Sequence, residues 1–250
     1  MRAICPKCNS THIQKKGVVY SKGFECNVQR YKCVGCCKQF QVPRDSPKVD
    51  LPKILLFDIE TAPMEVYVWG LYKQFIPHTN IIKDSDGEEK SWYVLSWAAK
   101  WLYDENVVSD IVTPEETKKR DDKRVLESIW KLLDEADIVI GHNGDRFDLR
   151  KLNARFIDNN IKPPSPFRTI DTLKVARREF AFVSYKQDYL TKHFKLEQKL
   201  STNFQLWVDC IHGVQEQLDT MEEYNRHDVM GLEEVYLKLR PYIKNHPNLG

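Results

Sequence analysis

Six of the seven cysteines lie within the first 40 residues, so this short segment has a chemistry that the rest of the chain lacks. Four of them form two Cys-x-x-Cys pairs, Cys5 with Cys8 and Cys33 with Cys36, with 24 residues between the pairs. A two-residue gap allows a tight turn to point both thiolates at one ion, and two such turns complete a tetrahedral sulfur site for Zn²⁺. A segment of about 40 residues rarely folds without a metal or disulfide bonds. The sequence therefore predicts a zinc ribbon over residues 1–42 that binds one Zn²⁺ ion.

Disulfide bonding and packing in a small core are the alternative uses of these cysteines. A cytosolic location argues against disulfide bonds. Cys37 is an alternative to Cys36 as the fourth ligand, whereas Cys26 is expected to be a small apolar filler. Short strands are expected at residues 18–20 and 28–31, on either side of a turn.

Charge is distributed unevenly along the chain. The net charge is +2, but residues 1–50 carry a balance of +7 and the remaining 200 residues a balance of −5. A basic ribbon on an acidic body suggests that the ribbon meets a polyanion. Its basic residues are expected to contact phosphates, or to form a solvated face: Lys15, Lys16, Lys22, Arg30, Lys32 and Lys38. Three prolines predict an extended linker over residues 43–52.

The sequence of the ribbon segment also resembles that of a known class of zinc ribbons. It is similar to the N-terminal zinc ribbons of some insertion-sequence transposases. The similarity lies in Cys5-Pro6-Lys7-Cys8, in the run Gln29-Arg30-Tyr31-Lys32-Cys33 and in Phe40. Those ribbons bind DNA, so the resemblance implies a nucleic-acid contact. A protein partner for the ribbon remains the alternative.

Composition excludes a membrane protein. Hydrophobic residues make up 42% and charged residues 30% of the 250 residues, which is typical of a globular protein. No apolar run reaches the roughly 18 residues of a spanning helix. Cys5 and Cys8 lie where a signal peptide would be apolar, so we expect a cytoplasmic protein, and the gene of a phage or mobile element is compatible with this. We expect no polymerase module, since nothing follows Gly250.

The body begins with an apolar run that ends in two acids. Residues 53–61 lack alternation, which predicts a strand buried on both faces. Asp58 and Glu60 near its end are two residues apart and point to the same side. Two carboxylates on one side of a core strand repel each other unless a cation lies between them, and oxygen ligands suit Mg²⁺ or Mn²⁺. The alternative is a strand end that emerges into solvent.

Two further segments place an acid on a face that should be apolar. In the first, a buried strand at 138–140 and a turn precede a helix, whose apolar stripe includes Asp148, Leu152 and Phe156. Asp145 in the turn is the alternative to Asp148 as the functional acid of this segment. A helix over 221–239 carries Tyr224 and Asp228 in its apolar stripe, for which a hydrogen-bonded pair is the alternative explanation. Four acids in such positions need compensating charge, and two divalent ions would supply it. Two-metal sites serve displacement at phosphorus.

Three short motifs of this chain resemble, in the same order, the three motifs of the DEDD (DnaQ-like) exonuclease superfamily. They are Asp58-x-Glu60, Asn143-x-x-x-Phe147-Asp148 and Tyr224-x-x-x-Asp228. Tyr224 in the third motif resembles the tyrosine of one branch of this superfamily, the branch that includes the proofreading domains of family-B DNA polymerases. The sister branch has a histidine five residues before the last acid, where this chain has Glu223.

That resemblance implies a ribonuclease-H-like α/β fold over residues 53–245, a mixed sheet flanked by helices, and 3′→5′ hydrolysis of nucleic acid to nucleoside 5′-monophosphates. By the match, Asp58, Glu60 and Asp228 would hold the first Mg²⁺ or Mn²⁺ ion. Asp58 would also contact the second ion, with Asp148 acting on it directly or through water, and Tyr224 would orient the attacking water. Substrate-binding candidates are Thr61, Asn143, Phe147, Lys174 and Arg177. DNA is favoured over RNA, as a single strand or a 3′ end.

Several smaller expectations concern the rest of the body. Residues 65–71, 91–103 and 106–113 are expected to form antiparallel strands beside the first strand, and 72–90 a loop. A helix is expected over about 121–135. Asp171 matches an acid common in the nucleases that this chain resembles, but it is expected to cap another helix. Trp207 is expected either to stack on a base or to belong to the core.

Two other functions remain open at this stage. One is a transposase- or resolvase-like endonuclease on the same fold, although such enzymes usually end their acid set with glutamate, and this set ends with Asp228. The other is an inactive adaptor that binds nucleic acid or protein through its ribbon.

Overall fold

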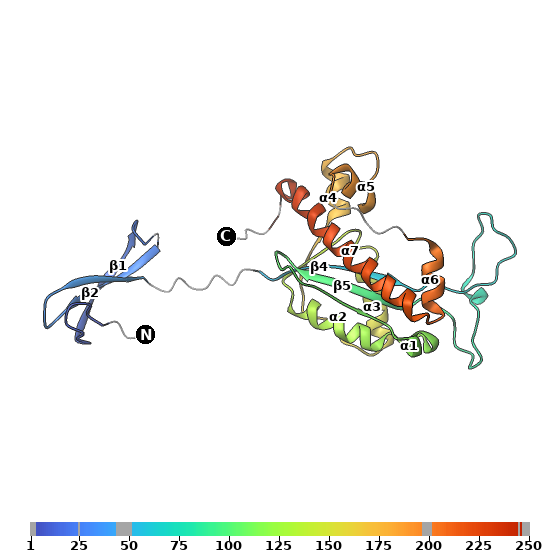
Figure 1. The fold of residues 1–250 in the computed structure, drawn as a ribbon, viewed down its shortest axis with the longest axis horizontal. Coiled ribbons are helices and arrows are strands. Elements are labelled where there is room, and N and C mark those ends of the chain that lie inside the picture. Colours follow the sequence, from blue (N-terminus) through green and yellow to red (C-terminus); the bar gives the residue numbers. More distant parts are fainter. Residues whose placement is uncertain (1–3, 25, 44–51, 197–201, 245, 247–250) are drawn as a thin grey trace. The chain divides into compact units, whose positions relative to one another are not determined.

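The structure, a computed structural model, describes residues 4–24, 26–43, 52–196, 202–244 and 246. It falls into two units, Met1–Leu51 and Pro52–Gly250, and each is described by itself (Figure 1). Of the expected linker 43–52, residues 44–51 lie outside the described residues.

The first unit is a three-stranded antiparallel sheet in the order β1-β2-β3. Its strands are β1 Ile13–Ser21, β2 Cys26–Cys33 and β3 Gln39–Pro43. The expected strands at 18–20 and 28–31 are confirmed within β1 and β2, and β3 is an addition. On β2 and β3 the paired Tyr31 and Phe40 stack with their ring centroids 5.5 Å apart.

The second unit is built on a five-stranded mixed sheet in the order β6-β5-β4-β7-β8. β4, β5 and β6 are antiparallel, whereas β7 and β8 run parallel to β4. The central position of β4 explains its unbroken apolar sequence, because both of its faces are covered. The strands are β4 Ile54–Thr61, β5 Val94–Trp101, β6 Val107–Ile111, β7 Ile138–Gly141 and β8 Arg168–Asp171.

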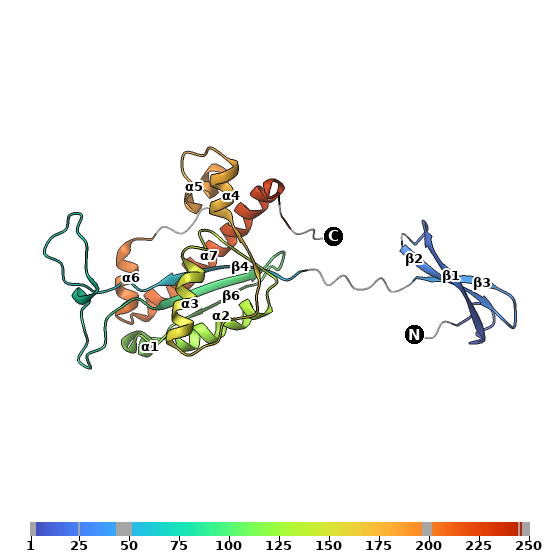
Figure 2. The same ribbon diagram turned by 180° about the vertical axis from the view of Figure 1, so that it is seen from behind.

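Helices cover both faces of this sheet. The long α7 packs across β4, β5 and β6 on one face, and α2 and α3 lie on the other (Figures 1 and 2). The expected α/β architecture, a mixed sheet flanked by helices, is confirmed. The helices are α1 Pro114–Lys119, α2 Lys123–Glu135, α3 Asp148–Asp158, α4 Thr172–Glu179, α5 Gln187–His193, α6 Phe204–Ile211 and α7 Gln215–Leu239. No helix among the described residues is both long and apolar enough to cross a bilayer.

The two faces of β4 belong to different cores. Leu55, Phe57 and Ile59 pack with the apolar residues of α2 and α3, whereas Ile54 and Leu56 pack against α7. Side chains alternate along a strand, so Asp58 and Glu60 continue the face that α7 covers.

The predicted hairpin is confirmed as β5 and β6, but the expectation for residues 65–71 is wrong. Val66 forms only an isolated bridge with Ile81, and no strand begins there. The reason lies in the backbone hydrogen bonds, since the N–H of Tyr67 donates to Asn80 O at 2.9 Å rather than to the main sheet. Residues 62–93 instead form a long connection with one short 3₁₀ turn, His78–Asn80.

Candidate active site

β4 and α7 bring three acids together. On β5, the residues that face Asp58 and Glu60 are the small Ala98 and Ser96, which leave room for α7 to approach. Asp228 is only 5% exposed on α7. One carboxylate oxygen from each of Asp58, Glu60 and Asp228 lies within 4.8 Å of the others. Three like charges this close, one of them buried, favour a bound cation, and oxygen donors suit a hard divalent ion.

Asp148 lies beside this cluster but is not one of its three members. It begins α3 and is buried, and its Oδ1 accepts a hydrogen bond of 3.2 Å from the backbone N–H of Ile59, the residue between the two β4 acids. β7 pairs with β4 only as far as Leu56, so the Asp148 carboxylate takes over a backbone donor that the strand leaves unpaired.

A tight glycine turn sets the position of Asp148. A Cβ on Gly141 would lie 3.1 Å from Cα of Gly144, and a Cβ on Gly144 would lie 3.2 Å from Cα of Gly141. The backbone between β7 and α3 therefore folds on itself so closely that a side chain at either position would push the turn open by a few tenths of an ångström.

Burial raises the pKa of the Asp148 carboxyl to about 7; the Ile59 N–H lowers it, and the nearby Asp171 raises it. A cation close to Asp148 would favour its ionised form. Asp171 caps α4 as expected, because its Oδ1 accepts from the N–H of Leu173 at 3.0 Å. The same oxygen accepts from the N–H of Asn143 at 3.0 Å, so it also holds the glycine turn.

The sequence reasoning missed Asn225. It is completely buried on α7, its Nδ2 donates to Asp58 Oδ2 at 2.7 Å, and its Oδ1 accepts from Ser96 Oγ at 3.2 Å. This chain of hydrogen bonds fixes the Asp58 carboxylate between β5 and α7. The available signal was a polar residue at a core position of α7, one residue after Tyr224.

Trp207 on α6 contacts two of the candidate residues. Its Nε1 donates to Glu60 Oε2 at 3.1 Å, and its ring meets that of Tyr224 edge-on, with centroids 5.9 Å apart. Tyr224 itself is 7% exposed. Trp207 therefore packs at the margin of the core and orients both the Glu60 carboxylate and the ring of Tyr224.

The five substrate-binding candidates fall into three places. Thr61 and Phe147 line a cavity of about 540 Å³ beside Glu60. Asn143 and Arg177 line a second cavity of about 540 Å³. Lys174 lines neither cavity, and its Nζ donates to Asp145 Oδ2 at 2.5 Å.

Aromatic side chains and one lysine line the cavity beside Glu60. Nζ of Lys151 lies 3.7 Å from the centroid of the Trp92 ring and 5.5 Å from that of Phe147. Burial lowers the pKa of Lys151, and the rings offset part of the cost of burying its charge. The second cavity is more basic, with Lys186 beside Arg177.

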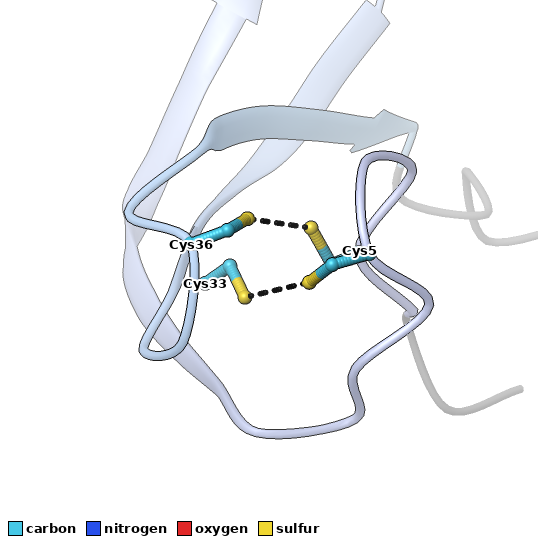
Figure 3. Close-up of side chains that lie close together, drawn as sticks. Cys5, Cys33 and Cys36 are labelled. Carbon is cyan, nitrogen blue, oxygen red and sulfur yellow. Dashed lines mark hydrogen bonds between the residues drawn. The ribbon is translucent and has the colours of Figure 1, made fainter.

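In the first unit, four sulfurs converge. The Sγ atoms of Cys5, Cys8, Cys33 and Cys36 all lie within 4.8 Å of one another. Two of the separations are 3.5 Å, Cys5 to Cys36, and 3.6 Å, Cys8 to Cys33. Figure 3 shows the thiols of Cys5, Cys33 and Cys36 turned toward one another. A tetrahedral zinc site with Zn–S bonds of about 2.3 Å has sulfurs about 3.8 Å apart, so the cluster matches a zinc site in size.

The turn that holds Cys33 and Cys36 favours one thiolate, although hydrogen bonds with the Cys36 and Cys33 sulfurs raise the pKa of the Cys8 thiol to about 12. The backbone N–H of Cys36 donates to the Cys33 thiol and is the main cause that lowers its pKa to about 6. A lowered pKa favours the thiolate that binds metal. Cys37, the alternative fourth ligand, is exposed and lies outside the sulfur cluster.

Comparison with known proteins gives one family and one fold. A model of the RNase H superfamily matches residues 87–240, and no curated protein matches the chain. The fold is similar to that of the family B DNA polymerase from the hyperthermophilic archaeon Pyrobaculum calidifontis, with a TM-score of 0.52 and 19% sequence identity. That match covers 76% of this chain but only 25% of the polymerase.

The family match includes Asp148, Tyr224 and Asp228, whereas Asp58 and Glu60 precede it. It spans more than half of the chain and agrees with the mixed sheet flanked by helices. Such a fold supports nuclease-type chemistry on a nucleic acid in general. The chain belongs to the RNase H superfamily.

Proposed function

We propose that this protein is a metal-dependent 3′→5′ exonuclease of the tyrosine DEDD type, which hydrolyses nucleic acid, with DNA favoured, to nucleoside 5′-monophosphates. One observation carries the proposal. One carboxylate oxygen from each of Asp58, Glu60 and Asp228 lies within 4.8 Å of the others, and Asp148 accepts a hydrogen bond from the backbone N–H between Asp58 and Glu60. The order of the motifs and Tyr224 support the exonuclease type.

The acids would divide between two metal positions. Asp58, Glu60 and Asp228 would hold one ion, and Asp58 with Asp148 the other. Two Mg²⁺ or Mn²⁺ ions, when bound, supply an activated water and stabilise the leaving oxygen. Asn225 keeps Asp58 in place, and Trp207 keeps Glu60 and the Tyr224 ring in place. Tyr224 would orient the attacking water through its hydroxyl.

The two cavities suit different parts of a strand. The cavity beside Glu60 is lined by aromatic rings, which suits the sugar and base of a 3′-terminal nucleotide. The second cavity, with Asn143, Arg177 and Lys186, suits a phosphate. Together they would place the terminal phosphodiester near the acids.

The ribbon, residues 1–42, would bind one Zn²⁺ ion through Cys5, Cys8, Cys33 and Cys36 and recruit nucleic acid to the body, residues 53–245. Residues 4–43 contain seven lysines and arginines but only one acid, Glu25. A compact segment with this charge attracts phosphates.

The direct test uses 5′-labelled, single-stranded DNA and RNA of the same sequence with Mg²⁺ or Mn²⁺. We expect a ladder that shortens from the 3′ end, faster for DNA, and no cleavage by Asp58→Ala. A circular single strand serves as the control, because it has no 3′ end. Internal cuts in the circle would identify an endonuclease, and an inactive wild-type protein that still binds DNA would identify an adaptor.

Replacement of Asn225 by leucine tests the positioning of Asp58. Leucine has a similar size but cannot donate to the Asp58 carboxylate, so we expect kcat to fall about 10–100-fold and the Mn²⁺ concentration for half-maximal rate to rise. Steady-state rates over a Mn²⁺ titration measure both effects. Ser96→Ala, which removes only the outer hydrogen bond, should shift both in the same direction but less. An unchanged Mn²⁺ dependence in Asn225→Leu would argue against the positioning role.

A further inference from the structure

The connection between β4 and β5 exposes large apolar side chains to an unusual degree. Trp69 is 100% exposed, Leu71 94%, Tyr72 92% and Phe75 92%. Soluble proteins rarely expose contiguous apolar surface of this kind unless it binds something. In Figures 1 and 2 this connection extends beyond α6.

The base of the connection is held firmly. Backbone hydrogen bonds join Ile82 N–H to Glu65 O at 2.9 Å and Lys90 N–H to Ile82 O at 2.7 Å. The Glu65 carboxylate pairs with Lys90 at 2.9 Å and with Arg120 at 2.5 Å. The exposed side chains are therefore presented from a fixed base.

Both ends of the connection border the cavity beside Glu60. Pro63 and Met64 at its start and Trp92 at its end are lining residues of that cavity. A polymer whose terminal unit occupies the cavity must leave it past residues of this connection or past α3 and α6. The connection that carries the exposed side chains thus begins and ends at the candidate active site.

The chemistry of the exposed surface favours nucleic acid over a protein partner. Four of its large side chains are aromatic: Tyr67, Trp69, Tyr72 and Phe75. Residues 66–82 contain no acid, and their one lysine is Lys73. Aromatic rings that stack on successive bases bind single strands without sequence preference, and Lys73 beside Tyr72 adds one positive charge for the phosphates.

We propose that Tyr67, Trp69, Tyr72 and Phe75 form a stacking surface for the unpaired bases of a single strand whose 3′ end occupies the cavity beside Glu60. This inference rests on the proposed exonuclease function and deepens it. The rings need unstacked bases, so the protein acts on single strands or frayed 3′ ends in preference to blunt duplexes.

The test compares a long and a short substrate on the full-length protein. The long one is a single-stranded DNA 20-mer, and the short one is the p-nitrophenyl ester of thymidine 5′-monophosphate, which reports on the metal site and the cavity beside Glu60 but is too short to reach the exposed rings. In the triple variant Trp69→Ala, Tyr72→Ala, Phe75→Ala we expect the ratio of kcat/KM for the 20-mer to that for the ester to fall about tenfold to hundredfold, mainly through KM.

Two controls separate stacking from general apolar contact. The triple leucine variant at the same three positions keeps apolar surface without rings and should lose as much as the alanine variant. Ile157→Ala changes an apolar residue on α3 that is 78% exposed, and should leave the ratio as in wild type. A leucine variant that performs like wild type would overturn the stacking surface.

A binding measurement keeps this inference separate from the proposed function. If wild type hydrolyses neither substrate, the exonuclease proposal fails. Fluorescence anisotropy of a 5′-fluorescein 20-mer then measures DNA binding directly and tests the stacking surface without any hydrolysis. Weaker binding by the alanine variant supports the stacking surface. Equal binding overturns it, and a simultaneous loss of self-association in sedimentation would assign the same side chains to a contact between protein chains.

Discussion

Asp228→Asn is expected to lower the rate of phosphodiester hydrolysis by about 10³-fold or more, because it removes a charge from the three-acid cluster at nearly constant shape. Asparagine keeps the size of the side chain and one carbonyl oxygen. The loss would therefore come from weaker ion binding and not from a rearranged helix.

The same substitution is expected to stabilise the metal-free protein. Asp228 is 5% exposed and close to Asp58 and Glu60, so neutralising it lessens the repulsion among three like charges. Each 1 kcal/mol of relieved repulsion raises the melting temperature by about 2–4 °C in a domain of this size. Mn²⁺ should raise the melting temperature of wild type but not that of the variant.

Calorimetry with and without Mn²⁺, beside a rate assay on labelled DNA, measures these effects. Asp219→Asn is the matched control, since it removes the same charge from an exposed position of α7. A variant that is inactive and also melts at a lower temperature without metal would mean that Asp228 supports the fold, and the metal site would need another acid.

Periodicity predicted the elements that carry the acids. The unbroken apolar run before Asp58 is typical of a strand covered on both faces, and β4 lies at the centre of the sheet. Asp148, Leu152 and Phe156 are the buried residues of α3, as the helical spacing required. The positions of acids within these patterns were informative because burial of a carboxylate is costly.

The same reasoning overlooked Asn225 because an amide carries no charge. A neutral polar residue in an apolar stripe costs less to bury than an acid and so gives a weaker signal. Its role depends on Asp58, 167 residues earlier in the chain, and on Ser96 of β5. No local pattern contains such contacts between distant segments, and the Trp207 bond to Glu60 is another example.

The connection after β4 was misjudged for a related reason. Alternating Val and Tyr residues at 66–68 have a strand-like pattern, but a strand also needs a neighbour with free backbone groups. β5 already occupies one edge of β4, and β7 and Asp148 occupy the other. The segment consequently pairs with itself and leaves its apolar side chains exposed.

The double variant Cys33→Ser, Cys36→Ser is expected to lose zinc completely and to unfold the ribbon while the body stays folded. Among residues 4–24 and 26–43, the buried side chains are Cys5, Val28 and Cys33. Two of these three are expected metal ligands, so the ribbon has almost no apolar core of its own. Structural zinc contributes about 10–16 kcal/mol to folding in small domains at pH 7, and nothing else in the described ribbon replaces that amount.

Metal analysis should find about one Zn²⁺ per wild-type chain, because four thiolates complete one tetrahedral site, and none in the double variant. Limited proteolysis should then cut the ribbon of the variant and spare the body, whose sheet and helices form a separate unit. Cys26→Ser and Cys37→Ser are the matched controls, and both should keep zinc, since neither sulfur belongs to the cluster. A ribbon that resists protease without metal would contradict the zinc site, and loss of zinc from Cys37→Ser would replace Cys36 with its neighbour as the fourth ligand.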